Sequence, residues 1–392
     1  MDASQRAARQ FIIIMYRDTT ITPPLRRVRV LILLTVVMVM AAPAGAGDHE
    51  VIFGAAVSEH AFNGLWDQKY TCMPDYRSEL KKLFSWGVTM NTGKMYRIHP
   101  DSRYEYYWDD LDRMVDWFER SDMNLKYHTI VWDVNLPDWY SALSQEESRA
   151  ALEEHVRTIL SRYKGRITMY DVVNEPMHKG DPDDYMGTGW TREEAITNIF
   201  IWANEEDPDA ILMVNEFYVL TNNDYYSVLD EYIDLINSVR TAGGPINAIG
   251  VQAHMGLITD SIALTDQTIN TALDKLAEET GLPIYITEFD ICAPGCMECY
   301  GDQDGDPGDP IEGFDSWWQY QAATERRIYQ TFIDHPGVYG VFRWAYFDMY
   351  NQTLSALFDS DFNPRPVYES LQDILVPAPP SSTGPVIIAP GQ

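Results

Sequence analysis

Basic residues are scarce in this sequence, which holds 29 Lys and Arg against 59 Asp and Glu and carries a formal charge of −30. A chain this acidic lacks the positive surface that neutralises phosphates, so we expect no nucleic-acid partner. Long apolar runs are also scarce. The one near the N-terminus, residues 30–42, is short for a membrane-spanning helix, which needs about 20 apolar residues.

The sequence around this apolar run has the three parts of a secretory signal peptide. Arginines at 26, 27 and 29 precede the run, and Ala-Gly-Ala at 44–46 follows it as an A-x-A cleavage site. We therefore predict that residues 1–46 are a cleaved signal peptide, that the protein is secreted, and that it has no membrane contact after cleavage. An uncleaved membrane anchor is the alternative.

Cysteine is rare, with Cys72, Cys292, Cys296 and Cys299 as the full set. In a secreted chain four cysteines are typical of two disulfides, and three connectivities are open. The Cys-x3-Cys-x2-Cys spacing of the last three is also compatible with a metal site, which an oxidising compartment disfavours.

An acidic stretch follows the cysteine cluster, with alternating aspartates spaced like the ligands of a calcium loop. It lacks the full EF-hand pattern and the closing Glu, so a flexible acidic loop is the preferred interpretation and a Ca²⁺ site the weaker one. The calcium candidates are Asp302, Asp304, Asp306 and Asp309.

Short apolar, β-branched stretches alternate with helical patterns eight times along the chain. We expect strands at 51–57, 87–90, 125–131, 167–173, 210–214, 246–252, 283–287 and 338–344. Helices are expected at 76–85, 109–120, 146–163, 195–204, 225–242, 268–280 and 314–334, with a last helix after Pro366.

Eight such units predict an α/β protein with a single (β/α)8 TIM barrel, residues 47–376, as the catalytic domain. A doubly wound sheet is the alternative, but no G-x-G-x-x-G follows the first strand. The Pro-rich residues 377–392 are expected to form an extended tail.

Carboxylates stand where two of these strands end. Glu288 and Asp290 follow the strand at 283–287, and Asn174 and Glu175 follow the strand at 167–173. In a barrel, these strand ends meet on one face, where catalytic residues gather. Two carboxylates facing each other are what a glycosidase needs, whereas the blander alternative is an ion pair or a helix cap.

Other strand ends would surround this pair with amides, histidines and flat rings, which suit a neutral ligand rich in hydroxyls. These residues are His128, Trp132 and Asp133, then Asn215 and Glu216, then Gln252 and His254, and finally Arg343, Trp344 and Asp348.

The strand-end motifs together resemble those of glycoside hydrolase family 10, the β-1,4-xylanase family. No single stretch is decisive, but their joint order and spacing follow the family over almost all of residues 47–376. They are residues 128–139 (HTIVWDVNLPDW), 171–176 (DVVNEP), 249–254 (IGVQAH), 286–290 (ITEFD), and the region from Trp344 to PRPVY at 364–368.

The resemblance implies a retaining mechanism with Glu175 as acid/base and Glu288 as nucleophile. By the same resemblance, Asn174 would bind the sugar 2-hydroxyl, His254 would bond the nucleophile, and Asp290 would support His254. It implies no cofactor and no catalytic metal. The substrate-binding set that it implies is His128, Trp132, Gln252 and Trp344, with Lys94 and Asn91 after the second strand.

The sequence departs from the family pattern on the side that grips the non-reducing sugars. The family has Glu-Asn and then Lys and Trp after the second strand, where this chain has residues 91–96, NTGKMY, with Lys94 shifted by one position. Asp133 stands where the family has a second histidine, and Glu216 stands where it has aspartate. Asn351-Gln352 stand in place of a second cleft Trp.

These observations predict a secreted, retaining endo-1,4-β-xylanase that acts as a monomer on a polysaccharide, either xylan or a related plant glycan. Two alternatives stay open. The same chemistry on a different glycan or glycoside would fit the altered residues 91–96. A carbohydrate-binding barrel without catalysis is opposed by the intact pair Glu175 and Glu288.

Overall fold

A computed structural model describes residues 49–64, 72–220, 227–256, 264–292, 308–311, 313–348 and 354–375. The predicted signal peptide, the predicted tail and part of the predicted acidic loop lie outside these residues. Among the residues singled out from the sequence, Cys296, Cys299, Asp302, Asp304, Asp306, Asn351 and Gln352 also lie outside them. Asp309 is described and is exposed.

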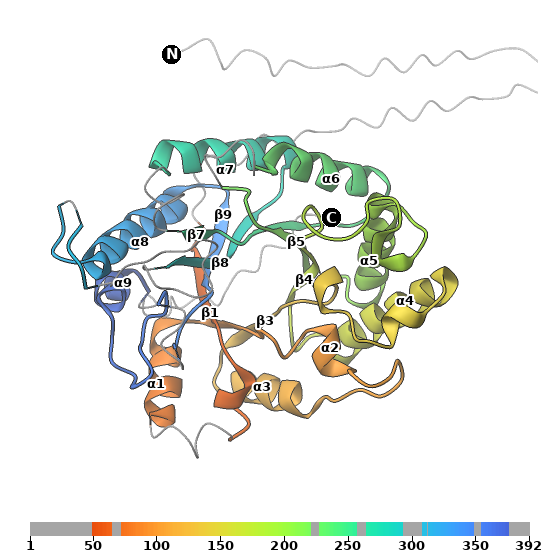
Figure 1. Ribbon diagram of the computed structural model, residues 1–392, viewed down its shortest axis with the longest axis horizontal. Helices are drawn as coiled ribbons and strands as arrows, with labels where there is room; N and C mark the ends of the chain where they lie inside the picture. Colours follow the sequence, from red (N-terminus) through yellow and green to blue (C-terminus); the bar gives the residue numbers. More distant parts are fainter. Residues whose placement is uncertain are drawn as a thin grey trace, which may run out of the picture. The chain divides into compact units, whose positions relative to one another are not determined.

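The described residues form a closed barrel of eight parallel strands, which confirms the predicted (β/α)8 fold (Figure 1). Neighbouring strands pair in parallel in the order β1-β2-β3-β4-β5-β6-β8-β9, and β9 pairs with β1 to close the barrel. The strands are β1 Ile52–Ala56, β2 Trp86–Val88, β3 Asn124–Tyr127, β4 Met169–Asn174, β5 Ile211–Glu216, β6 Ala248–Val251, β8 Ile284–Cys292 and β9 Val338–Arg343.

One barrel strand runs further than the sequence predicts. β8 continues to Cys292, so Glu288 and Asp290 lie within the strand instead of after it. Its outer half is paired with β7, His254–Gly256, a short strand that follows β6 after Ala253, whose φ is +60°. The partner strand keeps the backbone of β8 extended through the functional residues.

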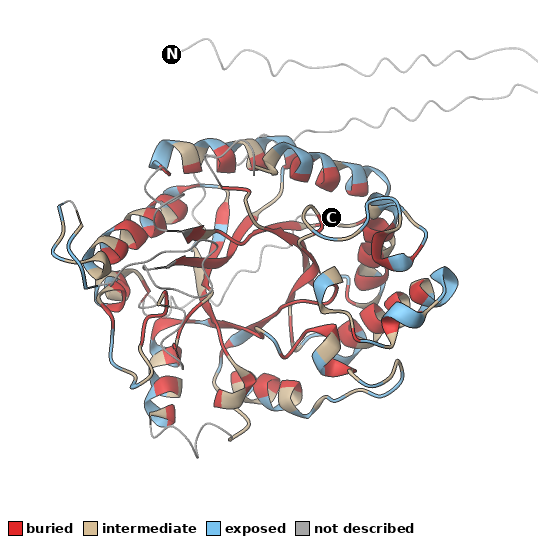
Figure 2. Ribbon diagram, in the orientation of Figure 1, coloured by how far each residue is buried: buried red, intermediate tan, exposed pale blue. Residues whose placement is uncertain are grey.

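The helices surround the barrel as a ring, and their buried faces point towards the strands (Figure 2). Within the described residues the α-helices are α1 Met73–Leu83, α2 Met95–Ile98, α3 Asp109–Arg120, α4 Gln145–Tyr163, α5 Arg192–Glu206, α6 Leu229–Thr241, α7 Asp266–Thr280, α8 Trp317–Asp334 and α9 Pro366–Leu375. The short helix α2 is absent from the sequence-based prediction. Among the helices in the described part of the chain, none is long and apolar enough to cross a membrane.

Capping explains why α5 begins three residues before its predicted start. The prediction used the first apolar residue, Ala195, whereas the helix begins where Thr191 caps it. Thr191 and Glu194 form a capping box, in which each side chain binds the other residue's backbone N–H. Ser144 and Glu147 start α4 in the same way.

Two apolar clusters lie on the two sides of the barrel wall. The larger one fills the space between strands and helices, and the smaller one fills the barrel interior. The inner cluster consists of Ala56, Trp86, Val88, Met169, Met213, Ala248, Tyr285 and Phe342. Gly54 makes room for it, because a Cβ there would lie 2.4 Å from the Phe342 ring. This apolar plug closes the barrel below the polar site.

The structure revises the expected disulfides. Cys72 is a free thiol, half-buried and packed against the large core, at the N-cap of α1. Its pKa is raised by burial. Cys72 packs there as a small apolar group. The predicted pairing of all four cysteines in two disulfides is therefore not seen. A disulfide among the remaining three stays a prediction.

Two buried histidines stack under the loop that precedes α3. The His99 and His155 rings lie 4.8 Å apart and nearly parallel, and His155 Nε2 lies 2.9 Å from the Ile130 carbonyl oxygen. Burial lowers the pKa of His99 to about 4 and that of His155 to about 3, from an ordinary value of 6.5. Both are therefore neutral in the folded protein at neutral pH.

These histidines should make the fold sensitive to mild acid. Between pH 6.5 and 4 the unfolded chain binds protons at these positions and the folded chain does not, so stability falls as the pH falls. His155→Phe should reduce the loss of unfolding free energy between pH 7 and pH 5 by about 2 kcal/mol.

Urea unfolding of wild type, His155→Phe and His99→Phe at both pH values measures this. The two variants serve as matched checks on each other, and an unchanged pH dependence in both would contradict the assignment.

Candidate active site

Glu288 lies at the centre of the site, inside the barrel mouth. Its side chain is 3% exposed, and Asn215 Nδ2 donates to its Oε1 at 2.7 Å. His254 Nε2 lies 3.2 Å from Oε2, and His128 Nδ1 lies 3.7 Å from Oε1. Burial alone would raise the pKa of Glu288, but His128, His254 and Lys126 together lower it to about 2. Glu288 is therefore a carboxylate at any ordinary pH.

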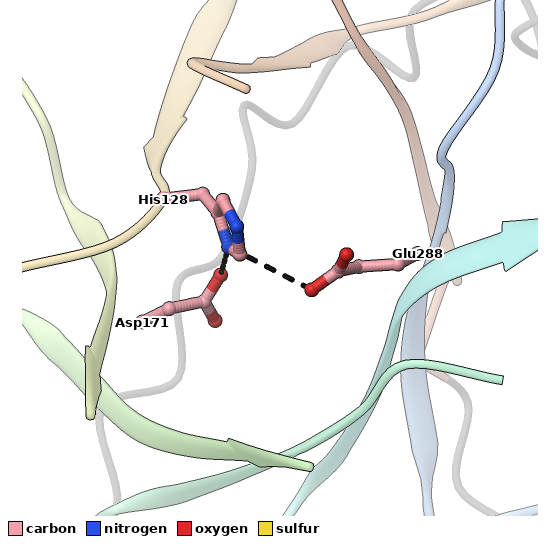
Figure 3. Close-up of side chains that lie close together, drawn as sticks. All are labelled: His128, Asp171 and Glu288. Atoms are coloured by element: carbon pink, nitrogen blue, oxygen red, sulfur yellow. Dashed lines mark hydrogen bonds and ion pairs between the residues drawn. The ribbon is translucent and has the colours of Figure 1, made fainter. Parts of the chain in front are cut away.

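A buried charge network supports Glu288 from the β3–β4 side. Figure 3 shows His128, Asp171 and Glu288 converging on one point inside the barrel. His128 Nδ1 lies 2.8 Å from Asp171 Oδ2, and the same carboxylate oxygen accepts a bond from Lys126 Nζ. Lys126 and Asp171 are both fully buried, where an unpaired charge would cost much free energy. Each side chain therefore neutralises the charge of the other.

The trio His128, Asp171 and Glu288 has the residue types and closeness of a metal site. It fits an ion poorly, because the Lys126 ammonium already bonds the Asp171 oxygen that faces His128. The trio is better explained as a salt-bridge network that orients His128 beside the nucleophile candidate.

A second histidine supports Glu288 from the β7–β8 side. His254 Nδ1 lies 2.8 Å from Asp290 Oδ1, and these two residues occupy paired positions of β7 and β8. Burial alone would lower the pKa of His254, but Asp290 and Glu288 raise it to about 10. As an imidazolium, His254 donates one N–H to each carboxylate. The supporting roles expected for His254 and Asp290 match this geometry.

Glu175 lies across the site from Glu288, directly after β4. Its backbone has φ +54°, and its N–H donates to the Asn215 carbonyl oxygen at 2.8 Å. Trp132 Nε1 donates to Oε2 at 3.0 Å and Gln252 Nε2 donates to Oε1 at 3.0 Å. Burial raises the pKa of Glu175, and the charges of Glu288 and Glu216 add to this rise. The two donors oppose the rise.

Amide side chains link the two glutamates. Asn215 Nδ2 donates both to Glu288 Oε1 and to Asn174 Oδ1, the latter at 2.8 Å. Gln252 Nε2 reaches Asn174 Oδ1 at 3.4 Å and Glu175 Oε1 at 3.0 Å. Because the Asn174 oxygen accepts from both amides, its own NH₂ group is left as the donor for a ligand.

Glu216 holds the chain that follows Glu175. It is fully buried, and its Oε2 accepts from the Met177 N–H at 2.8 Å while its Oε1 lies 2.9 Å from His178 Nδ1. The His178 ring stacks on Phe217 with centroids 3.7 Å apart. The glutamate that replaces the family's aspartate therefore fixes the turn carrying Glu175.

The residues expected to bind substrate flank this centre. Lys94 Nζ lies 4.7 Å from the centre of the Trp132 ring and donates to Asn91 Oδ1 at 2.9 Å. Lys94 is 6% exposed, whereas Asn91 is exposed. Burial lowers the pKa of Lys94, and the charges of Glu288 and Glu175 oppose this shift. Lys94 therefore lies on the Trp132 side of the site, close enough for the two glutamate charges to act on its pKa, despite its shift in sequence.

Trp344 forms the remaining wall. It is half-buried, and its ring lies edge-on to His128 at 5.3 Å and to His254 at 5.7 Å. The structure thus brings together the residues Asn91, Lys94, His128, Trp132, Asn174, Glu175, Gln252, His254, Glu288, Asp290 and Trp344. Of the other strand-end residues, Arg343 bonds Glu325 and Asp348 bonds Arg365. The calcium candidates other than Asp309 lie outside the described residues. Asp309, the one of these that is described, is not among the residues at the barrel mouth.

Lys126 and Asp171 are two residues of this site that the sequence analysis does not name as candidates. A signal for them exists in the period-two alternation of the strands, which places Lys126 on the same face as His128 and Asp171 on the same face as Met169. A charged residue at an inward position of a buried strand marks a polar site or a buried ion pair.

Comparison with known proteins agrees with this geometry. The family model described as Glycosyl hydrolase family 10 matches residues 45–374. Endo-1,4-beta-xylanase B of Thermotoga neapolitana is 30% identical over 333 residues, covering 80% of this chain and 87% of that protein. Beta-1,4-xylanase of Dictyoglomus thermophilum is 28% identical over 308 residues, covering 75% and 82%.

Solved structures give the same result. The crystal structure of xylanase 10B from Thermotoga petrophila RKU-1 in complex with xylobiose has a TM-score of 0.67 at 26% identity, covering 83% of this chain and 94% of that chain. Native xylanase 10B from Thermotoga maritima has a TM-score of 0.66, also at 26% identity, with the same coverage. The family model spans most of the sequence and the barrel superposes on these enzymes, so this chain belongs to glycosyl hydrolase family 10.

Proposed function

We propose that this protein hydrolyses internal β-1,4-xylosidic bonds of xylan with retention of configuration, using Glu288 as nucleophile and Glu175 as acid/base. The observation that carries this proposal is the opposite electrostatic setting of two glutamates in one polar site. Glu288 has a pKa of about 2, whereas the pKa of Glu175 is raised. One is ready to attack as an anion and the other to donate a proton.

In the first step a Glu288 oxygen attacks the anomeric carbon as the glycosidic C–O bond breaks. Glu175 gives its proton to the departing oxygen, and a covalent glycosyl ester forms on Glu288. In the second step Glu175 removes a proton from water, which attacks the same carbon and releases Glu288. Glu175 thus ends the cycle protonated again.

The change of role of Glu175 follows from its surroundings. The charge of Glu288 is one cause of the raised pKa of Glu175. When Glu288 becomes an ester, that charge is gone, so the pKa of Glu175 falls. The donors Trp132 and Gln252 then stabilise its anion, which is the form needed to activate water.

The altered segment 91–96 is the reason to keep a different glycan as the second candidate. Thr92 does not face the cleft as a free donor, because it is buried and its Oγ1 donates to Glu59 Oε2 at 2.9 Å. Arg97 Nη2 donates to the other Glu59 oxygen at 2.9 Å. This leaves Asn91, Lys94 and Tyr96 as the polar side chains of the segment that remain candidates for contact with a sugar.

We further propose that the protein acts outside the cell, on the basis of the signal-like residues 1–46. N-terminal sequencing of protein from the culture medium should begin at residue 47. Retention of the intact N-terminus in the cell membrane fraction would contradict secretion.

Loss of either glutamate should abolish hydrolysis of arabinoxylan. In Glu288→Ala no nucleophile is left, so we expect the rate of xylo-oligosaccharide release to fall by at least about 10⁴-fold. In Glu175→Gln the rate should fall less on an aryl xylobioside with an activated leaving group, because such a group departs without a proton. Reducing-end release and chromophore release measure the two rates.

The first-formed product should have the β configuration, which proton NMR of a fresh reaction shows directly. An α product would contradict retention. Hydrolysis of another glycan in parallel assays, with none of xylan, would move the substrate to the second candidate and leave the glutamate roles in place.

The hydrogen bond from Trp132 to Glu175 should affect the pH dependence of kcat/KM. Trp132→Phe removes a donor that stabilises the Glu175 anion, so the pKa of Glu175 should rise further. The basic limb of kcat/KM should then move to higher pH by roughly half a unit to one unit. Trp344→Phe is the matched control, because Trp344 edges the two histidines instead of Glu175, and its basic limb should stay in place. A downward shift in Trp132→Phe would contradict the assignment.

A further inference from the structure

The support of the nucleophile continues behind Asp290 into the described chain that follows β9. Asp290 uses Oδ1 for His254, and its other oxygen, Oδ2, accepts from Ser355 Oγ at 3.0 Å. Ser355 is 1% exposed and Asp290 is 6% exposed, so water does not replace this bond. Ser355 is thus the partner that occupies the second oxygen of the carboxylate which orients His254.

Ser355 is itself fixed by a fully buried ion pair. Arg343, at the end of β9, bonds Glu325 of α8 and also donates to the Ser355 carbonyl oxygen. Arg343 Nε donates to the Ala345 carbonyl oxygen at 2.8 Å. Both Arg343 and Glu325 are fully buried, so the guanidinium has little freedom to choose other partners.

The residue one turn earlier on α8 makes a second tie. Gln321 is buried on the same face as Glu325, and its Nε2 donates to the carbonyl oxygens of Leu354 and Ile291. Leu354 precedes Ser355, and Ile291 follows Asp290. Gln321 therefore holds the two chain segments that carry the donor and the acceptor of the Ser355–Asp290 bond.

We infer that Ser355, anchored by Arg343 and Glu325, is a positioning residue that sets the orientation of Glu288 through Asp290 and His254. Without the hydroxyl, the Asp290 carboxylate loses the partner of Oδ2 and is less restricted about its terminal torsion, which has a broad energy minimum. His254 then loses a fixed partner, and Glu288 loses a fixed donor 3.2 Å from Oε2. Ser355 touches neither substrate nor Glu288, so its effect passes through these two residues.

The inference rests on the proposed function for its kinetic test. Ser355→Ala is nearly isosteric and removes one hydroxyl. We expect kcat on arabinoxylan to fall about tenfold with KM within twofold of wild type. We expect the same factor on the activated aryl xylobioside, because attack by Glu288 is impaired whatever the leaving group. Ser148→Ala, which removes another buried hydroxyl, on α4, should keep kcat within twofold.

A spectroscopic measurement separates this inference from the proposed function. In the wild type, the His254 Nδ1 proton bonded to Asp290 should give a slowly exchanging downfield proton resonance, identified by its loss in His254→Gln. In Ser355→Ala that resonance should broaden through faster exchange with water, while melting temperature shows that the fold is kept. This readout does not depend on which glycan is cleaved.

An unaltered His254 resonance together with kcat within twofold of wild type would overturn the inference. A loss expressed only in KM would also overturn it, because a group that orients the nucleophile acts on the transition state.

Discussion

The structure depends on keeping one ionised carboxylate out of water. Glu288 is almost fully buried inside the barrel mouth, and an unpaired buried carboxylate would take up a proton. The barrel prevents this with Lys126 and His128 on one side and His254 on the other. Asp171 in turn bonds Lys126 and His128, and Asp290 bonds His254. The polar side chains around Glu288, above the apolar cluster inside the barrel, are the groups that stabilise this single charge.

The pKa of the second glutamate, Glu175, is shifted in the opposite direction. Glu175 is half-buried, lies near two other glutamates, and accepts its side-chain hydrogen bonds from two neutral donors, Trp132 and Gln252. The pKa of the same residue type is therefore shifted in opposite directions by its position alone. The amides of Asn215 and Gln252 connect the two settings without transferring charge between them, since an amide neither gains nor loses a proton in this range.

Much of this arrangement is predictable from the sequence. The eight β/α units and the strand-end motifs specify the barrel, and the pattern around Glu175 and Glu288 specifies the family. The pairing of β7 with β8 is not predictable, because it depends on a break at Ala253, a residue that carries no turn signal in the sequence. Lys126 is overlooked for a related reason, since a lysine counts against a buried strand unless its Asp171 partner is known.

The contact of Ser355 with Asp290 could not be predicted from the sequence. Ser355 lies in an irregular segment, far along the chain from Asp290, and carries no motif. Only the buried Arg343, noted at the end of its strand, indicates that a polar partner must lie nearby. Contacts of this kind are specified by tertiary packing, which no local pattern encodes.

The two glutamates also differ in the kind of backbone that carries them. Glu288 lies inside β8, an extended strand with neighbours on both edges, whereas Glu175 lies on a turn with positive φ that is held by Glu216. Backbone inside a sheet moves less with temperature than backbone in a turn. In the proposed mechanism, warming or loosening the molecule should therefore disturb proton donation by Glu175 before it disturbs attack by Glu288. Adaptation of such an enzyme to cold or heat would then act first on the segment after β4, while the strand that carries Glu288 stays unchanged.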